Sequence, residues 1–425
     1  MTNTTYGEAT WRLGSAAVLF AFVLDPLGNV PNVAAFVVMV VATIQVLTNK
    51  PENAGANGRL LAIAVIIALI AALEILNPNV PTLSVGLVGF RKSATFVLGV
   101  AIGVGWRGAR LRGLQLTWWC MLVAGSVSIA AHLGFLPLDR LTARNAGMYS
   151  GSIGGVDRMH GLFAGPFHVS MLGAFLVISA LAPKVVIRRP LLRAAGAAVG
   201  FACVFFSHVR TGYVAVAVGA LVMVMVTGSV QRWAGRLIGS AALMALAGIY
   251  IGPITELARS NPALGRLIES GAQDDRFTAR FQTWKTSLDL VDRSPLIGWG
   301  SGSAGDTLGP YFVGGQHVSA HNVFLKYAVE GGLLQGFLFV VLTVGLLLAV
   351  RSRYDPTRFG LAAAVTIIIF ASVGASVEAI PVSFGLAVIW GLCAGQTTIN
   401  DVPGEPRKRM PAMSAMALDS SRDGR

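Results

Sequence analysis

Long apolar segments alternate with short polar ones along almost the whole chain. A helix needs about 20 mainly apolar residues to cross the hydrocarbon core of a bilayer, and most of the apolar segments are close to that length. Lipid offers no hydrogen-bond partners to the backbone, so helices are expected, and the short alternation of barrel strands is not found. We predict an all-α polytopic membrane protein with about twelve transmembrane helices. They fall near residues 12–28, 31–48, 59–76, 92–106, 113–136, 161–182, 190–207, 211–228, 235–252, 322–350, 359–374 and 379–397.

Composition agrees with a membrane protein and narrows the choice of partners. The chain is 54% hydrophobic and 12% charged, whereas soluble proteins carry about 25% charged residues. The formal net charge of +13 would suggest a nucleic-acid partner in a soluble protein. Here Lys and Arg mark the cytoplasmic loops instead, and we expect the lipid bilayer as a partner and no nucleic acid. Cys120, Cys203 and Cys393 stand apart in apolar segments, which argues against a zinc site or a disulfide framework.

The distribution of basic residues predicts the orientation. The loops on one side carry most of the Lys and Arg, and the same side holds both termini, so we assign it to the cytoplasm. The N-terminus lacks a cleavable signal pattern, so the first span is expected to anchor the chain. We expect residues 1–400 to form a single integral membrane domain in the bacterial inner membrane. Residues 401–425 are expected to form a disordered basic cytoplasmic tail.

The opposite, outer side receives two long segments, near 137–160 and 253–320. Within the second segment, apolar residues recur at helical spacing and predict an amphipathic helix that lies in the membrane interface. These residues are Phe277, Phe281, Trp284, Leu288 and Val291. Arg276 and Arg280 share one face beside this stripe and could turn toward a cavity above the membrane. The alternative is a surface helix with solvated charges. The helix is expected to end before Ser294-Pro295.

Two further residues at the outer ends of spans are candidates for chemistry. Arg210 lies between two apolar segments, where an arginine marks either a functional site or an interface position from which its charge reaches water. His321 stands at the outer mouth of the span that begins near residue 322, where water and a lipid headgroup could both reach it. An imidazole is a suitable general base near neutral pH, and the alternative is a capping or interface histidine.

The same span carries two charges and a glycine motif. Lys326 and Glu330 are four residues apart, so they can neutralise each other on one helix face, and we interpret them as a structural pair. Gly332 and Gly336 form a GxxxG motif, which predicts close packing against another helix.

Several of these segments together resemble the bacterial O-antigen ligase and O-antigen polymerase superfamily. The resemblance rests on RFQTW, then SPLIGWGSG, then HN leading into FLKYAVEGGLLQGF. SHVRTGY resembles the Ser-x-Arg segment of that superfamily, with two residues between Ser207 and Arg210. RMHGLFAGPFHVSMLGAF resembles its Arg-x-x-Gly-x-Phe…Pro element, although Phe167 and His168 stand where an Asn often follows the proline. The resemblance covers about 155–350, under half of the chain.

The resemblance implies a membrane glycosyltransferase of GT-C-type architecture that acts in polysaccharide assembly. Such enzymes transfer a glycan from an undecaprenyl-diphosphate donor to a hydroxyl on a glycan or lipid-linked acceptor, at the periplasmic or outer face. They need no cofactor and no metal, and they work beside other polysaccharide-assembly proteins. His321 matches the family histidine and would act as the base in an inverting transfer. Arg210 and Arg280 match the diphosphate-binding arginines, with Arg276 and Arg158 as additional candidates.

Other functions remain open at this stage. A ligase, a polymerase and a protein O-oligosaccharyltransferase differ in acceptor, which the sequence does not specify. A transporter or flippase of a lipid-linked glycan would use the same arginines to bind phosphate and would release it unchanged. Asp274-Asp275 is the one place where a metal-dependent GT-C mechanism could apply.

Overall fold

The protein is described from a computed structural model. The structure describes residues 2–48, 55–106, 110–136, 158–182, 186–226, 275–351, 359–374 and 376–395, apart from gaps at 25, 26, 28, 164, 306, 307, 313 and 379. The helices are α1 Thr2–Leu24, α2 Asn29–Thr48, α3 Gly55–Leu73, α4 Leu83–Gly105, α5 Arg110–His132, α7 Pro166–Leu181, α8 Pro190–Ser207, α9 Arg210–Val226, α13 Asp275–Arg293, α14 Val323–Arg351, α15 Phe359–Val373 and α16 Val382–Ala394. Short 3-10 turns, η2 Glu74–Leu76, η4 Gly309–Tyr311 and η5 Ser376–Glu378, join some of them.

The helices confirm the prediction of an all-α polytopic membrane protein. Six described helices are long and apolar enough to cross a membrane, and four shorter apolar helices accompany them. Within the described residues, the only β pairing is an isolated bridge between Ala304 and Val318. The predicted span at 235–252 and the tail at 401–425 lie outside the described residues.

Two predicted helix starts were wrong: α1 begins at Thr2, ten residues before the predicted 12–28 span. The fourth span was placed at 92–106, but α4 begins at Leu83, after Thr82, whose side chain accepts a hydrogen bond from the Val85 amide at 3.3 Å. Capping by threonine satisfies one of the unpaired amides of the first turn, so the helix starts there. Arg91 therefore lies within the helix and not before it.

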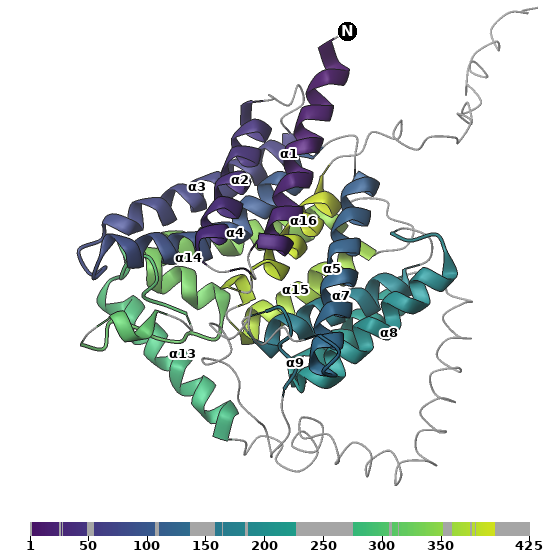
Figure 1. The fold of residues 1–425 in the computed structure, drawn as a ribbon. Coiled ribbons are helices and arrows are strands. Elements are labelled where there is room, and N and C mark those ends of the chain that lie inside the picture. Colours follow the sequence, from purple (N-terminus) through teal and green to yellow (C-terminus); the bar gives the residue numbers. More distant parts are fainter. Residues whose placement is uncertain are drawn as a thin grey trace, which may run out of the picture.

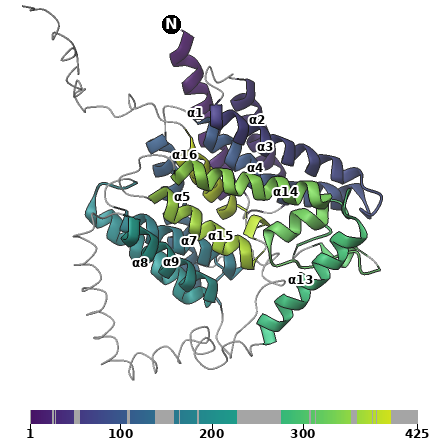
Figure 2. The same cartoon turned by 180° about the vertical axis from the view of Figure 1, so that it is seen from behind.

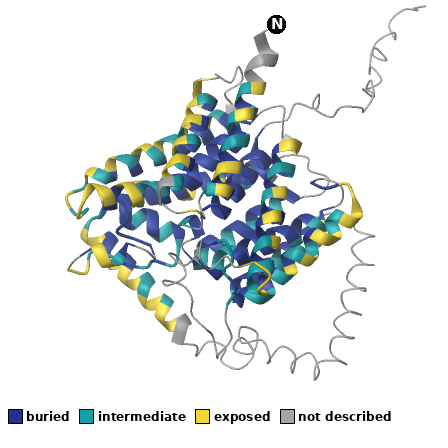
Figure 3. Cartoon of the chain, in the orientation of Figure 1, coloured by how far each residue is buried: buried dark blue, intermediate teal, exposed yellow. Residues whose placement is uncertain are grey.

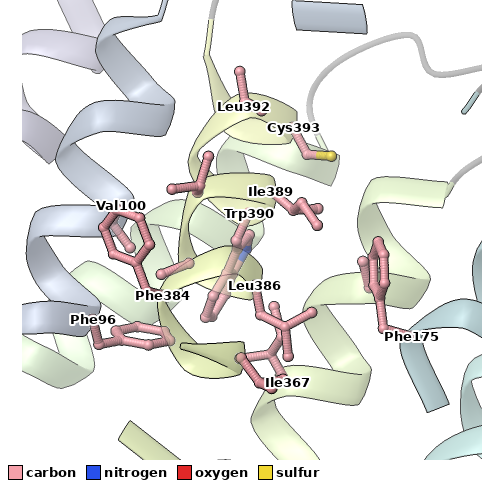
Figure 4. Packing of buried hydrophobic residues seen from close by; sticks show 14 of the residues in the cluster. Phe96, Val100, Phe175, Ile367, Phe384, Leu386, Ile389, Trp390, Leu392 and Cys393 are labelled. Atoms are coloured by element: carbon pink, nitrogen blue, oxygen red, sulfur yellow. The ribbon is translucent and has the colours of Figure 1, made fainter. Parts of the chain in front are cut away.

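The core is built around α16, every residue of which is buried. Figure 1 places α16 between the α1–α4 group and the group of α5, α7, α8 and α9. Small residues let α16 approach α4: a methyl group on Gly103 would meet the Val388 carbonyl at 2.2 Å. Figure 4 shows aromatic residues packing around this contact, with Phe96 and Trp390 meeting edge to face at 6.5 Å.

The outer helices expose apolar side chains, as expected for surfaces that face lipid. Figure 3 shows buried residues in the centre and exposed ones along the outer helices. Leu69 and Leu73 on α3, and Leu334 and Phe337 on α14, are each more than half exposed. A soluble protein rarely exposes so many large apolar side chains.

Helix α14 is broken at Gly331 and Gly332, whose backbone angles are not helical. The segment after α13 fills the break: the Trp299 and Gly300 amides donate to the Val329 and Glu330 carbonyls at 2.8 and 2.9 Å. The Leu333 amide donates in turn to the Pro295 carbonyl at 2.8 Å. The interpretation of Gly332 as a packing position of a continuous GxxxG helix was therefore wrong, because this glycine lets another backbone segment enter the helix.

Replacing Gly332 by alanine is expected to destabilise the protein. Gly332 has φ 75° and ψ −175°, and its added methyl would lie 2.7 Å from backbone atoms of Leu296. Such strain costs about 1–3 kcal/mol, so we expect a lower thermal unfolding midpoint in detergent. Gly345→Ala on the same helix is the control, because its methyl meets only the flexible Leu60 side chain. Equal midpoints for the two variants would contradict the assigned role of Gly332.

Candidate active site

The turn between α8 and α9 brings two of the predicted arginines together. His208 ends α8 in the left-handed conformation, with φ 52°, and Arg210 begins α9 two residues later. Arg158 comes from the segment before α7, and its Nε donates to the Ser207 carbonyl at 3.1 Å. The next residue, Met159, donates its amide to the Phe206 carbonyl at 2.9 Å. Arg158 therefore lies against the turn from which Arg210 begins α9.

Contacts among α7, α9 and α15 fix the level of this turn. Helix α9 runs parallel to α7, because Gly212 lies against Ser170 and Gly219 against Ile178. Helix α15 runs antiparallel to α7, because Phe167 meets Phe370 and Phe175 meets Phe359. The N-terminal ends of α7 and α9 therefore lie at the same level as the C-terminal end of α15.

The mouth of α14 lies at this same end. Asn322 caps the helix, since its Oδ1 accepts hydrogen bonds from the Phe324 and Leu325 amides at 2.9 and 3.1 Å. Its Nδ2 donates to the carbonyl of Ser372, in the last turn of α15, at 3.1 Å. His321 directly precedes this cap with φ 46° and is half-buried. The fold thus gathers Arg158, Arg210 and His321 at one end of α7, α9, α14 and α15.

Helix α13 has the bounds expected of the amphipathic helix and carries the other two arginines. Its C-terminal half packs against α14 and the segment between the two helices through Leu290 and Val291, which are buried. Figures 1 and 2 show its N-terminal half extending from the body of the protein. Arg280 lies in that half and is half-buried, and the Arg276 side chain lies outside the described residues. Among the described elements α13 packs mainly on α14 and α9 on α7 and α15, so these contacts do not join Arg280 to Arg210.

The apolar stripe predicted for α13 is only partly buried. Val291 faces the core cluster, whereas Phe281 and Leu288 are 62% and 57% exposed. The adjoining Leu296 and Ile297 are also exposed. This distribution is compatible with the predicted contact of α13 with the membrane interface.

The surroundings of His321 distinguish it from other histidines. His208 is buried in the turn, and His317 is half-buried beside Phe312, with tilted rings whose centroids are 5.8 Å apart. Burial lowers the pKa of His317, and the negative charge of Glu378 opposes that effect. His160 and His321 are half-buried at the same end of the molecule as Arg158. Of these two, His321 is the one held at a capped helix mouth.

The predicted Lys326–Glu330 pair is confirmed, with Nζ and Oε1 2.6 Å apart. It belongs to a larger buried network that the sequence did not reveal. Lys326 also contacts Glu378 at 3.0 Å and the Ala304 carbonyl at 2.5 Å. Glu330 accepts hydrogen bonds from Ser93 Oγ at 2.6 Å and the Gly302 amide at 3.0 Å. Glu378 reaches Lys92 at 3.5 Å, so the network joins α4, α14, η5 and the loop before His321.

A comparison with known protein families finds one family that matches this region of the chain. The model of the O-antigen ligase family matches residues 195–340. The resemblance to the O-antigen ligase and polymerase superfamily is therefore confirmed. The match spans α8, α9, α13 and the first half of α14, so it includes Arg210, Arg276, Arg280 and His321, whereas Arg158 precedes it. No curated protein matches the chain.

The described residues include no group of three or more His, Cys, Asp or Glu side chains that could hold a metal ion. Asp274 lies outside the described residues, and Asp275 begins α13.

Proposed function

We propose that this membrane protein of the O-antigen ligase and polymerase type transfers a glycan from an undecaprenyl-diphosphate donor to an acceptor hydroxyl. The acceptor is a lipid-linked glycan or the lipid core of the cell surface. The observation that carries the proposal is the gathering of Arg158, Arg210 and His321 at one end of four helices. That end combines two fixed positive charges with an imidazole, at a level where a lipid headgroup meets water.

The proposed reaction follows from the chemistry of these groups. His321 takes the proton of the acceptor hydroxyl, whose oxygen attacks the anomeric carbon from the face opposite the phosphate. The bond between the anomeric carbon and the phosphate oxygen breaks, and undecaprenyl diphosphate leaves with the bonding electrons. The product has inverted configuration. The role of the base is worth about 10²–10⁴ in rate for a typical enzyme.

The diphosphate gains negative charge as it leaves, and arginines are suited to neutralise it. A guanidinium presents a planar fork that matches two phosphate oxygens. We assign this role to Arg210 and Arg280, with Arg158 and Arg276 as further contacts. Because α13 reaches beyond the body of the protein, we propose that Arg280 and Arg276 meet the donor from above the membrane. The proposed reaction needs no metal and no cofactor.

The proposal includes an orientation and a domain organisation. Positive-inside bias places both termini in the cytoplasm and the site at the periplasmic or outer face of the bacterial inner membrane. Residues 1–400 then act as one integral membrane domain, with 401–425 as a basic cytoplasmic tail. Acting beside other polysaccharide-assembly proteins is part of the same proposal.

If arginines bind the diphosphate, a substitution that keeps the positive charge but loses the guanidinium fork should still lower glycan transfer. Arg210→Lys and Arg280→Lys keep the charge but lose the fork, and each is expected to lower glycan transfer about 10- to 100-fold, with alanine lower still. Transfer is measured as the amount of surface glycan on gels of a deletion strain that carries each variant at matched expression. Arg293→Lys, an exposed position on the same helix as Arg280, is the control and should behave as the wild type. Wild-type transfer by the lysine and alanine variants alike would contradict the diphosphate role.

A further inference from the structure

Glu74 is a buried acid that the proposed reaction does not use. It lies in η2, directly after α3, and is 5% exposed. Its backbone carbonyl accepts hydrogen bonds from the Asn77 and Ser301 amides at 3.2 and 3.3 Å. Both carboxylate oxygens are buried without a hydrogen-bond partner. A buried carboxylate in this condition is strongly unfavourable unless a positive charge joins it.

The neighbouring donors are already engaged. An ammonium group has three N–H donors, and Lys326 directs its three to Glu330, Glu378 and the Ala304 carbonyl. The Tyr327 hydroxyl donates to the Ser93 carbonyl at 2.6 Å, and the Ser93 hydroxyl donates to Glu330 at 2.6 Å. The nearby network therefore has no N–H or O–H left for Glu74 among these side chains.

Gln335 is a second buried polar side chain at the same place. It is 0% exposed, and neither its oxygen nor its nitrogen has a hydrogen-bond partner. Both side chains point toward Gly331. A methyl group added there would lie 2.0 Å from Glu74 Oε1 and 2.6 Å from Gln335 Oε1. Two oxygens thus converge at the break in α14. Turning the Gln335 amide would offer one N–H, but it would leave the charge of Glu74 in place.

Ser301, next to the Glu74 backbone, carries another buried oxygen. Ser301 donates its amide to the Glu74 carbonyl, and its buried hydroxyl has no partner. Carboxylate, amide and hydroxyl oxygens favour hard cations, and breaks in membrane helices provide such sites for H⁺ or Na⁺. Because Glu330 is neutralised by Lys326, a single positive charge balances Glu74. We propose that Glu74, Gln335 and Ser301 bind one monovalent cation, H⁺ or Na⁺, at the break in α14.

The test measures the stability of the full-length protein in detergent and does not depend on the glycan reaction. Thermal unfolding is followed by tryptophan fluorescence for the wild type, Glu74→Gln and Glu8→Gln, the last being an exposed control. In one arm NaCl replaces choline chloride at constant ionic strength and pH 7. In the other arm, the pH varies in choline chloride alone. Glu330, Lys326 and Tyr327 face Glu74 and are unchanged in all three proteins, so differences report Glu74.

The two cations give different results. If Na⁺ is bound, the wild-type and Glu8→Gln midpoints rise by about 2 °C or more with Na⁺, and Glu74→Gln does not respond. If H⁺ is bound, the folded protein carries one proton more than the unfolded chain near neutral pH. The wild-type midpoint then rises relative to Glu74→Gln as the pH falls from 8 to 6.

Identical responses of the wild type and Glu74→Gln in both arms would overturn the proposal. If Glu74→Gln does not fold, Gln335→Leu replaces it, since this variant keeps the acid and removes one oxygen. If Na⁺ is bound, the Na⁺ concentration that gives half of the midpoint rise should change by about tenfold in this variant. If H⁺ is bound, the pH at which its midpoint changes should move by about one unit. An unchanged response of Gln335→Leu would equally overturn the proposal.

Discussion

His321→Ala is expected to lower glycan transfer by about 10²–10⁴-fold, to the level of a strain that lacks the protein. The imidazole precedes the Asn322 cap, and that cap fixes the mouth of α14 against Ser372 on α15. Removing the imidazole leaves the cap and the helix in place, so the fold should persist while the proposed proton acceptor is lost. The measurement is a surface-glycan gel of the deletion strain complemented at matched expression.

His321→Gln separates catalysis from transport. Glutamine can replace histidine as a hydrogen-bonding group but cannot accept a proton near neutral pH. A glycosyltransferase should lose activity with either substitution, whereas a flippase of a lipid-linked glycan should tolerate glutamine. His132→Ala, at the C-terminal end of α5, is the matched control and should retain the wild-type pattern. A wild-type glycan pattern with His321→Ala would refute the base assignment and favour the transport function.

The same gel distinguishes the two closest enzyme functions. Single repeat units on the acceptor in the deletion strain would identify a polymerase. Polymer that accumulates on the carrier lipid without reaching the acceptor would identify a ligase. The His321→Ala pattern should match the deletion strain in either case.

Lys326→Met is expected to destabilise the protein by about 3–5 kcal/mol, the usual effect of removing one partner of a buried ion pair. Lys326 is 1% exposed and Glu330 is 0% exposed, so the substitution leaves Glu330 and Glu378 buried without their shared cation. Methionine has nearly the length of lysine, which limits the loss of packing. The measurement is the thermal unfolding midpoint of the purified protein in detergent.

Two further variants make the Lys326 result interpretable. Lys285→Met, at an exposed position on α13, controls for the change of residue type and should keep the wild-type midpoint. Lys326→Met combined with Glu330→Gln should recover part of the lost stability, because it removes one of the uncompensated charges. Additive losses in the double variant would show that the two side chains do not stabilise each other.

The network also bears on the position of the proposed base. Lys326 and Glu330 contact Ala304 and Gly302 in the loop that leads to His321. The same loop is closed by hydrogen bonds between Gly305 and Val318 and between Val318 and Ser303. Loss of Lys326 is therefore expected to lower transfer as well as stability.

Much of the helical architecture could be predicted from local pattern. A membrane helix satisfies all its backbone groups within one segment, so an apolar stretch of sufficient length is enough to identify it. Helix α13 was equally predictable, since its apolar residues recur at helical spacing and Ser294-Pro295 follow its last residue, Arg293. The candidate residues Arg210, Arg280 and His321 could be named from their places on the side of the spans predicted to be the outer one, and Arg158 from the family resemblance.

The sequence did not predict the helix start and the helix break that depend on contacts with distant parts of the chain. Helix α4 begins nine residues earlier than predicted, at a threonine cap, and its Gly89 lies against the backbone of Ser301 and Gly302, far away in the sequence. Gly332 resembled a packing glycine, since nothing nearby in the sequence reveals that Pro295 and Trp299 enter α14.

The sequence by itself determined the class of the protein and most of its spans, and it supplied the residues that we propose handle a diphosphate and a proton. It also indicated that Lys326 and Glu330 needed partners, because an ionised group in an apolar segment must be neutralised. The pairing with each other was predicted, and only the tertiary structure revealed the further partners Ser93, Gly302 and Glu378. Ser93 meets Glu330 across 237 positions of the chain and Lys92 meets Glu378 across 286. Such pairs, like the gathering of Arg158, Arg210 and His321, arise from the packing of whole helices, which no local pattern encodes.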